Sequence, residues 1–409
     1  DTSSQTLRHS KNYSLAKSGA KECQPCPQEA YCWGKANIGP KEGFWRDGPW
    51  SDEFFRCPNR EACLGVQPEK NDDPKGECAN GYQGRLCSEC QEGYRQTFLY
   101  HCSKCPDLFY SIAQLCLVAI AVIAFAVIII KSTKSMASKP KVLVPVYMRV
   151  LTNYVQMVMP LAVFELNWSS KVMSVLRAQQ TVGSFSEVLI SFDCLVDRSD
   201  FRIYYQKTSL VLLLPVIIFL IATSAAAFRH FFDRQNDEIT KREFKIVFTV
   251  LIYLIYPDLL RRSLSLFGCR TLSKGEDYLR ADYEIECWQG DHLTFATTVG
   301  TFGLVCWGIG LPSLAFVVLR SGRKSLTRDK LRAHYGYLIN GYQHKFYYWE
   351  LVLTYRKIVI AFITVFLSGL NPGVQALLAV IFLVMCLYVQ LINRPFVASD
   401  LNNLETISL

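Results

Sequence analysis

The stretch LFYSIAQLCLVAIAVIAFAVIII, residues 108–130, is a run of 23 residues without a charged side chain. An α-helix of about 20 apolar residues is long enough to cross the hydrocarbon core of a bilayer, so this stretch predicts a transmembrane helix. The composition agrees, because 50% of the 409 residues are hydrophobic and the mean hydropathy is +0.15. We therefore expect a membrane protein and not an ordinary soluble one.

Six further apolar segments follow this first span. We expect them to cross the membrane at 142–164, 203–228, 246–267, 292–319, 346–370 and 374–392. The second is the most polar, because Arg149, Asn153 and Gln156 interrupt it. The last two are joined only by the turn sequence NPG, residues 371–373, which predicts an antiparallel hairpin of helices. The expected fold of residues 108–409 is a mainly α-helical transmembrane bundle of about seven spans.

Residues 1–107 have a different composition, rich in Gly, Pro and Cys and without a long apolar run. Such a segment has little core, so cross-links must supply its rigidity. An even number of cysteines in a short, loop-like segment is typical of a disulfide-rich extracellular module. The ten cysteines of this segment are Cys23, Cys26, Cys32, Cys57, Cys63, Cys78, Cys87, Cys90, Cys102 and Cys105.

Lysine and arginine near the ends of the spans predict the orientation of the bundle. Basic residues are dense in 131–141, 229–245 and 320–332, whereas 268–291 holds three and the NPG turn none. We therefore expect residues 1–107 outside the cell and the C-terminus in the cytoplasm, in the plasma membrane or another membrane of the secretory pathway. The net charge of +9 matters less than this placement, and the basic loops are expected to lie against anionic lipid and not nucleic acid.

Two glycosylation sequons agree with this orientation. Asn12 and Asn167 each begin an Asn-x-Ser sequence, and both fall on the predicted outer side. Cys194, Cys269 and Cys287 fall there too, and this odd number predicts one pair that ties loops together, with one thiol free or bonded elsewhere. Cys116, Cys306 and Cys386 lie inside spans and are expected to be apolar packing residues.

The sequences CSEC, residues 87–90, and CSKC, residues 102–105, raise a choice between two chemistries. Two CxxC pairs at this spacing fit a zinc ribbon, or they fit a ladder of disulfides. Because thiols oxidise outside the cell, we favour disulfides and expect no metal. The sequence does not give the connectivity of ten cysteines, so the pairing stays open.

Ionisable residues inside the predicted spans need a partner or a watery surrounding. Asp258 comes three and four residues before Arg261 and Arg262, and Glu350 comes seven before Lys357, spacings that share one helix face. Arg356 lies beside Lys357, and Arg149 is the third such position. These charges either neutralise one another and fix the helix register, which we favour, or they line a path for an ion, a proton or a ligand.

No sequence signature of catalysis is present. The chain lacks a phosphate-binding loop, a GxSxG or HExxH motif and a dinucleotide fingerprint, and no two of its six histidines have metal-ligand spacing on one helix. We therefore expect neither an enzyme nor a bound cofactor. The first residue is Asp and no signal peptide is present, so we expect a processed chain or part of a longer one.

Two regions resemble known families. CANGYQGRLCSECQEGYRQTFLYHCSKCP, residues 78–106, resembles the laminin-type EGF and ephrin-receptor-like cysteine repeats. FKIVFTVLIYLIYPDLLRRSLSLFGC, YGYLINGYQHKFYYWELVLTYRKIVIAF and NRPFVASDLNNLETISL resemble the C-terminal membrane region of large cell-surface proteins of single-celled eukaryotes. That region is distantly similar to the TRP-like and flavin-carrier-like proteins of fungi. The resemblance runs from about residue 78 to the end, and it implies a channel or a sensor attached to an ectodomain.

Three functions follow from these observations. The first is a non-enzymatic surface protein that anchors a cysteine-rich ectodomain for adhesion, assembly or sensing, with membrane lipids and other surface or extracellular proteins as partners. The second is a TRP-like cation channel or transporter that uses Asp258, Arg261, Arg262, Glu350 and Lys357, although the NPG turn leaves no room for a re-entrant loop between the last two spans. The third is a seven-helix receptor. The sequence predicts no oligomeric state.

Overall fold

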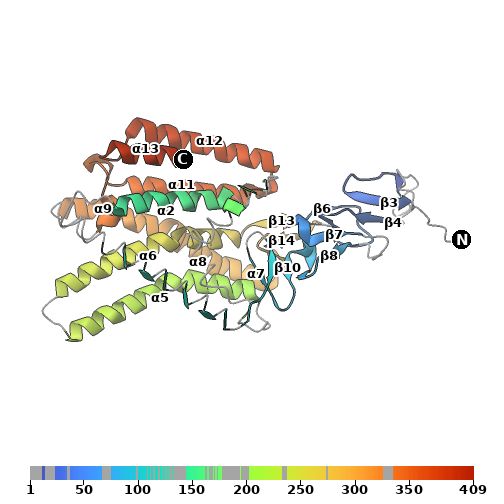
Figure 1. Cartoon of the computed structure of the whole chain (residues 1–409), viewed down its shortest axis with the longest axis horizontal. Helices are drawn as coiled ribbons and strands as arrows, with labels where there is room; N and C mark the ends of the chain where they lie inside the picture. Colours follow the sequence, from blue (N-terminus) through green and yellow to red (C-terminus); the bar gives the residue numbers. More distant parts are fainter. Residues whose placement is uncertain are drawn as a thin grey trace. The chain divides into compact units, whose positions relative to one another are not determined.

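The computed structural model divides into two compact units (Figure 1). The cysteine-rich unit comprises Asp1–Leu108, Phe192–Asp197 and Cys269–Leu293, and the helical unit comprises Phe109–Ser191, Arg198–Gly268 and Thr294–Leu409. The structure describes residues 12–13, 24–34, 37–66, 75–97, 100–107, 144–161, 202–232, 237–272, 275–325 and 335–409, with single residues or short groups at 109–131, 164, 169, 171–172, 174–176 and 194.

Short antiparallel strand pairs separated by turns make up the N-terminal part of the cysteine-rich unit. They pair in sequence order, β1 with β2 and so on to β11 with β12. The strands are β1 (Asn12–Tyr13), β2 (Gln24–Pro25), β3 (Ala30–Gly34), β4 (Asn37–Pro40), β5 (Phe44–Trp45), β6 (Phe55–Arg56), β7 (Cys63–Gly65), β8 (Glu77–Cys78), β9 (Tyr82–Gln83), β10 (Glu89–Cys90), β11 (Tyr94–Gln96) and β12 (Cys102–Lys104). Gly81 allows one of the turns, with φ of 90° and a Tyr94 ring so close that a Cβ would lie 2.5 Å from it.

Among the described residues, six disulfides cross-link this unit, so the prediction of disulfide bonds is confirmed. They join Cys26 to Cys32, Cys57 to Cys63, Cys78 to Cys87, Cys90 to Cys102, Cys105 to Cys194, and Cys269 to Cys287. One disulfide, Cys90–Cys102, joins the two CxxC pairs, and their other cysteines, Cys87 and Cys105, bond outside them. The described residues hold no group of three or more metal-ligating side chains. Cys23 and Asn167 lie outside the described residues, whereas Asn12 begins β1.

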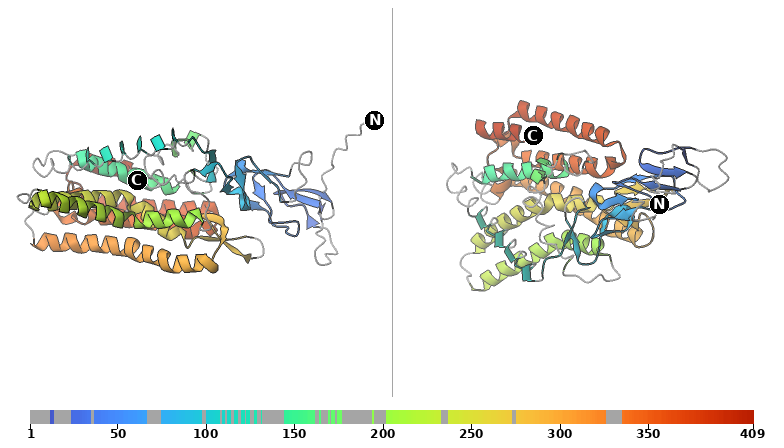
Figure 2. Two further views of the ribbon diagram at one scale, coloured as in Figure 1. Left: turned by 90° about the horizontal axis from the view of Figure 1, so that it is seen from below. Right: turned by 45° about the vertical axis from the view of Figure 1, so that its right-hand side comes forward.

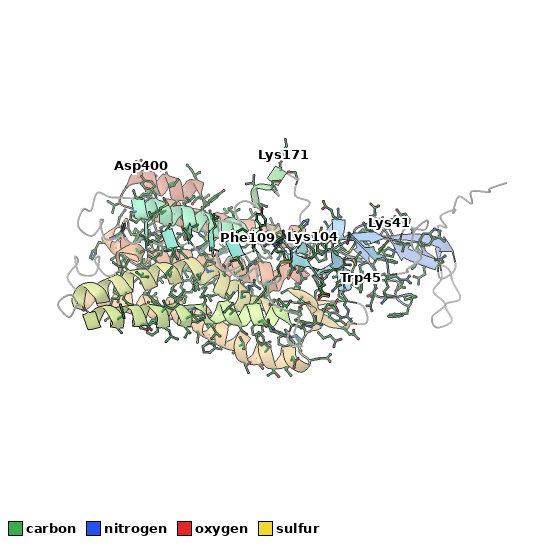
Figure 3. The ribbon with its side chains drawn as sticks, turned by 60° about the horizontal axis from the view of Figure 1, so that its bottom comes forward. Lys41, Trp45, Lys104, Phe109, Lys171 and Asp400 are labelled. Carbon is green, nitrogen blue, oxygen red and sulfur yellow. A yellow bond between two sulfur atoms is a disulfide. The ribbon has the colours of Figure 1, made fainter. Side chains whose placement is uncertain are left out.

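The segment after residue 268 contributes a three-stranded sheet to the cysteine-rich unit. β13 (Cys269–Thr271), β14 (Asp277–Leu279) and β15 (Asp282–Glu286) are antiparallel neighbours. Leu272, Tyr278 and Tyr283 from this segment are buried in one apolar cluster with residues of the N-terminal part, among them Trp45 and Leu86. Figure 3 labels Trp45 on β5. A stretch that the sequence places between two spans is therefore part of the core of the disulfide-rich unit.

Long helices that run alongside one another form the helical unit (Figure 2). They are α2 (Val144–Leu161), α5 (Ile203–Phe232), α6 (Asp237–Ser265), α11 (Trp349–Phe366), α12 (Pro372–Asn393) and the short α13 (Ser399–Ile407). A further helix runs through α7 (Gly290–Phe295), the π-helix η7 (Ala296–Gly300), α8 (Thr301–Gly303), the π-helix η8 (Leu304–Gly310) and α9 (Leu311–Ser325). At the NPG turn, Asn371 accepts a hydrogen bond from Gly373 N and caps α12.

The expected seven membrane spans are not supported. In the part of the chain that the structure describes, four helices are long and apolar enough to cross a membrane: Ile203–Ser224, Gly290–Gly322, Trp349–Gly369 and Pro372–Asn393. The predicted spans at 142–164 and 246–267 form helices, but Arg149, Asn153 and Gln156 make α2 too polar, and Asp258, Arg261 and Arg262 charge α6. Only scattered residues of the predicted first span, 108–130, are described.

The π-helical segments lie where two helices pack closely. A Cβ on Gly300 would lie 3.0 Å from the ring of Phe267, which follows α6, and one on Gly303 would overlap the hydroxyl of Ser263 in α6. π-helices are rare and mostly occur at functional or strained positions. The close approach explains why small residues recur along this face of the helix.

Candidate functional site: a buried polar network in the helical unit

Helix α2 carries three polar side chains on its inner face. Arg149, Asn153 and Gln156 recur at intervals of four and three residues, which places them on one side of a helix. They are 1%, 1% and 6% exposed, respectively. The polar residues that interrupt this predicted span therefore point into the helical unit.

Arg149 pairs with Glu350 of α11. Its Nε lies 3.0 Å from Glu350 Oε2, and both side chains are almost fully buried. The guanidinium also donates to the main-chain oxygens of Asn340, at 2.9 Å, and Tyr337, and it lies 4.6 Å from the centre of the Tyr342 ring. A buried charge is tolerated when it is paired and hydrogen-bonded, and this guanidinium has a carboxylate at ion-pair distance and hydrogen bonds from its two terminal nitrogens to main-chain oxygens.

Glu350 is surrounded by donors from three other parts of the chain. Its Oε1 accepts from Tyr253 OH of α6 at 2.7 Å and from Asn153 Nδ2 at 3.3 Å, and its Oε2 accepts from Tyr342 OH at 2.8 Å. The carboxylate is thus held by four side chains, one of them cationic. This geometry stabilises one fixed arrangement of α2, α6 and α11.

Lys357 is the cation of the network without a carboxylate partner. It is 6% exposed, and its Nζ donates to Gln156 Oε1 at 2.7 Å and lies 4.7 Å from the Tyr253 ring centre. Gln156 Nε2 in turn donates to Leu254 O at 3.2 Å, in the turn that precedes Pro257. Among the described residues, no carboxylate oxygen lies within 4 Å of this ammonium group.

Arg356 pairs with a residue near the end of the chain. Its Nη2 lies 3.1 Å from Glu405 Oε1 of α13, and the two side chains are 5% and 0% exposed. Burial raises the pKa of Glu405 above its ordinary value, and the charge of Arg356 opposes this effect. The pair attaches α13 to α11.

Sequence reasoning found some members of this network and missed others. Arg149, Glu350, Arg356 and Lys357 are all buried. The sequence suggested Lys357 as the partner of Glu350, because the two are seven residues apart, but the direct partner of Glu350 is Arg149. Asp258 is 9% exposed, and Arg261 and Arg262 are partly buried.

Sequence reasoning missed Tyr253, Tyr342 and Glu405. The helical spacing of Arg149, Asn153 and Gln156 was a usable signal of an inward polar face. Nothing in the sequence around Glu405 marks it as buried.

A second polar contact joins the sheet of β13–β15 to the N-terminal strands. Glu284 Oε1 accepts from Arg85 N at 2.5 Å, and its Oε2 lies 3.7 Å from the Arg85 guanidinium. Gly84 has φ of 75°, and a Cβ there would lie 2.5 Å from the same carboxylate. Glycine is therefore required at position 84, the second glycine of the sequence GYQG, because of its backbone conformation and the close approach of Glu284.

Four apolar helices and a disulfide-rich unit define the class of this molecule. Helices of this length and composition suit a bilayer, and disulfides persist in oxidising surroundings. These features indicate a membrane protein with a disulfide-rich extracellular part. The described residues do not define the number of spans beyond the four apolar helices.

Comparison with known proteins identifies relatives that are named for their cysteine repeats. The chain is similar to cysteine repeat modular protein A of Toxoplasma gondii, with 24% identity over 427 aligned positions that cover 86% of this chain. Cysteine repeat modular protein B of the same organism is 30% identical over 135 positions, or 31% of this chain. The matches span only 13% and 2% of the two relatives, respectively.

Residues 54–105 match a domain of unknown function, DUF7630. This stretch contains the strands β6–β12 and the disulfides Cys57–Cys63, Cys78–Cys87 and Cys90–Cys102. No solved structure matches the chain. The comparisons therefore support a relation to cysteine repeat proteins, and they do not show a TRP-like relation.

Proposed function

We propose that the chain is the membrane region of a multi-pass, non-enzymatic cell-surface protein that couples a cysteine-rich ectodomain to a helical bundle for sensing or adhesion. The cysteine-rich unit would lie outside the cell with Asn12 and Asn167 glycosylated, and the C-terminus would lie in the cytoplasm. Its partners would be extracellular or surface proteins that contact the cysteine-rich unit. Similarity to large cysteine repeat modular proteins supports this proposal.

The observation that carries the proposal is the composite core of the cysteine-rich unit. Leu272, Tyr278 and Tyr283 are buried with the N-terminal cysteines, and Arg85 contacts Glu284 across 199 residues of sequence. The chain enters this sheet from α6 and leaves it into α7. A displacement of the unit by a ligand or by force would therefore act on the chain at the ends of these two helices.

Hydrogen exchange on the full chain in lipid nanodiscs tests this coupling. Glu284→Gln is expected to speed exchange in β14 and β15 and also in the last turn of α6 and the first turn of α7, because a looser sheet no longer restrains them. Glu92→Gln, at an exposed position of the same unit, is the control and is expected to change neither region. If β14 and β15 loosen while α6 and α7 keep their wild-type exchange, the unit is not coupled to these helices.

A channel or transporter is the alternative function, and one observation favours it. Lys357 is buried without a carboxylate in contact, an arrangement that suits a group which meets a mobile ion or proton better than one that only fixes helix register. Ionic current through purified protein in planar bilayers distinguishes the two functions. Current that disappears in Lys357→Gln, with surface delivery unchanged, would favour conduction; no current under voltage or stretch would favour the anchored sensor.

A further inference from the structure

The packing register of α11 and α12 brings two buried polar side chains opposite each other. The two helices are antiparallel, and Gln375 Nε2 donates to Ile363 O at 2.9 Å and Thr364 O at 3.3 Å, while Ala379 packs with Ile360. Three turns beyond Ala379 is Gln390, and three turns before Ile360 is Trp349, since each turn holds about 3.6 residues. The register therefore puts Gln390 and Trp349 at the same level of the α11–α12 pair.

Both of these side chains have unused hydrogen-bonding atoms. Gln390 is 2% exposed, and neither its Oε1 nor its Nε2 has a hydrogen-bond partner in the described part of the chain. Trp349 is 4% exposed, and its indole Nε1 is likewise unpartnered. By contrast Gln375, at the other end of the same inner face of α12, is fully accommodated by α11 carbonyls.

The Arg356–Glu405 pair adds two further unused atoms at this end of the bundle. Arg356 Nε and Glu405 Oε2 make no hydrogen bond within the described residues, although both side chains are buried. Helix α13 packs on α12 (Figure 1), its Leu401 is buried in one cluster with Trp349, and its Glu405 pairs with Arg356, so the four side chains lie where α11, α12 and α13 meet.

Buried polar atoms in folded proteins are almost always hydrogen-bonded, to protein or to ordered water. The indole and the arginine Nε offer only donors, the carboxylate oxygen only accepts, and the Gln390 amide does both. A guest that satisfies this set must donate and accept within a small volume. Lipid tails can do neither, and an anion would meet the Glu405 carboxylate, so water is the chemistry that fits.

We propose that the junction of α11, α12 and α13 is an internal hydration site, in which water molecules bridge Trp349, Gln390, Arg356 and Glu405. The bridged waters join α13 to α11 and α12, and they extend the hydrogen-bonded network of Glu350 and Lys357 toward the end of the bundle. The site does not depend on the proposed surface function. It requires only the burial and the unused atoms of these four residues.

Radiolytic hydroxyl-radical labelling of the full chain in nanodiscs, read by mass spectrometry, tests the proposal, because bound water labels its buried neighbours. The chain contains its own references: Trp45 is 7% exposed and Trp288 is 44% exposed. We expect Trp349 to be labelled at a rate closer to that of Trp288 than to that of Trp45. Protection of Trp349 equal to that of Trp45 would overturn the proposal.

Substitutions on α12 provide a second test of the hydration site. Gln390→Leu is expected to abolish the labelling of Trp349 and to lower Tm, because it removes the amide that holds the water. Gln375→Leu is the matched control; it is expected to lower Tm through its lost α11 contacts while the labelling of Trp349 stays at the wild-type rate. If Gln390→Leu raises Tm and leaves the labelling unchanged, the amide is a dry, unsatisfied group and the site is not hydrated.

Discussion

Arg149 and Glu350 show how a single residue can be tolerated inside an apolar bundle. Each lies deep in the helical unit, yet the guanidinium uses a carboxylate, two carbonyls and an aromatic face, and the carboxylate uses two phenols and an amide. Arg356 is held less completely, by a single contact to Glu405. The buried charges therefore differ in how many contacts stabilise each of them besides the ion pair.

Glu350→Gln tests this dependence. The substitution keeps the size of the side chain and leaves Arg149 buried without a counter-charge, and breaking a buried pair in this way costs about 3–5 kcal/mol. We expect a clearly lower Tm for the detergent-solubilised full chain. Tyr355→Phe, at a position of α11 that is 56% exposed, is the control and is expected to leave Tm unchanged. A wild-type Tm for Glu350→Gln would mean that the pair contributes little to stability.

Glu405 predicts a pH dependence. Its pKa in the folded chain is raised above the ordinary value of 4.5 by burial, so the folded state binds its proton more tightly than the unfolded state does. The stabilising contribution is then present below pH 4.5 and is lost as the pH rises through the folded pKa. We expect the Tm of the wild type to fall relative to that of Glu405→Gln over this interval, measured in a series of buffers. Parallel profiles would contradict the raised pKa.

At the scale of elements, the sequence predicted apolar helices well and polar ones poorly. The expected spans at 203–228, 292–319, 346–370 and 374–392 correspond to the four apolar helices, because an uninterrupted apolar run needs no knowledge of neighbours. Helix α2 depends on partners far away in sequence, such as Glu350. The close packing of Gly300 in η7 and Gly303 in α8 depends on Phe267, which follows α6, and on Ser263 of α6, and no local pattern indicates these contacts.

Gly303→Ala tests the close contact between α8 and α6. The added methyl group would overlap Ser263 Oγ, which is buried and already donates to Leu259 O at 2.9 Å, so the two helices must separate. Such overpacking costs about 1–3 kcal/mol, and we expect a lower Tm. Gly369→Ala, where a Cβ meets nothing within 4 Å, is the control. Restoration of Tm by adding Ser263→Gly would locate the effect in this contact.

At the scale of the whole molecule, the cysteine-rich unit is assembled from segments that are distant in the sequence. Its disulfide character followed from cysteine density, but its extent did not, because Cys194 and the residues 269–293 lie between helices. The GYQG motif indicated a turn, whereas its contact with Glu284 required the folded chain. The network around Glu350 could be inferred only in part for the same reason: its members are brought together by tertiary packing.

The bond between Cys105 and Cys194 gives a prediction at this scale, because it bridges 89 residues of sequence. A protease site inserted within residues 132–143 would cut the chain between the two cysteines. We expect the fragments to remain joined on a non-reducing gel and to separate on reduction. In Cys194→Ser the fragments are expected to separate without reductant; if they separate in the wild type too, the bond is absent.

The composite sheet has a consequence for biosynthesis. Arg85 and Glu284 are 199 residues apart, and the aromatic side chains that complete the apolar cluster follow α6 along the chain. The early cysteines thus emerge from the ribosome long before the strands that will cover them. The apolar cluster of the cysteine-rich unit can therefore be completed only after α5 and α6 have been synthesised.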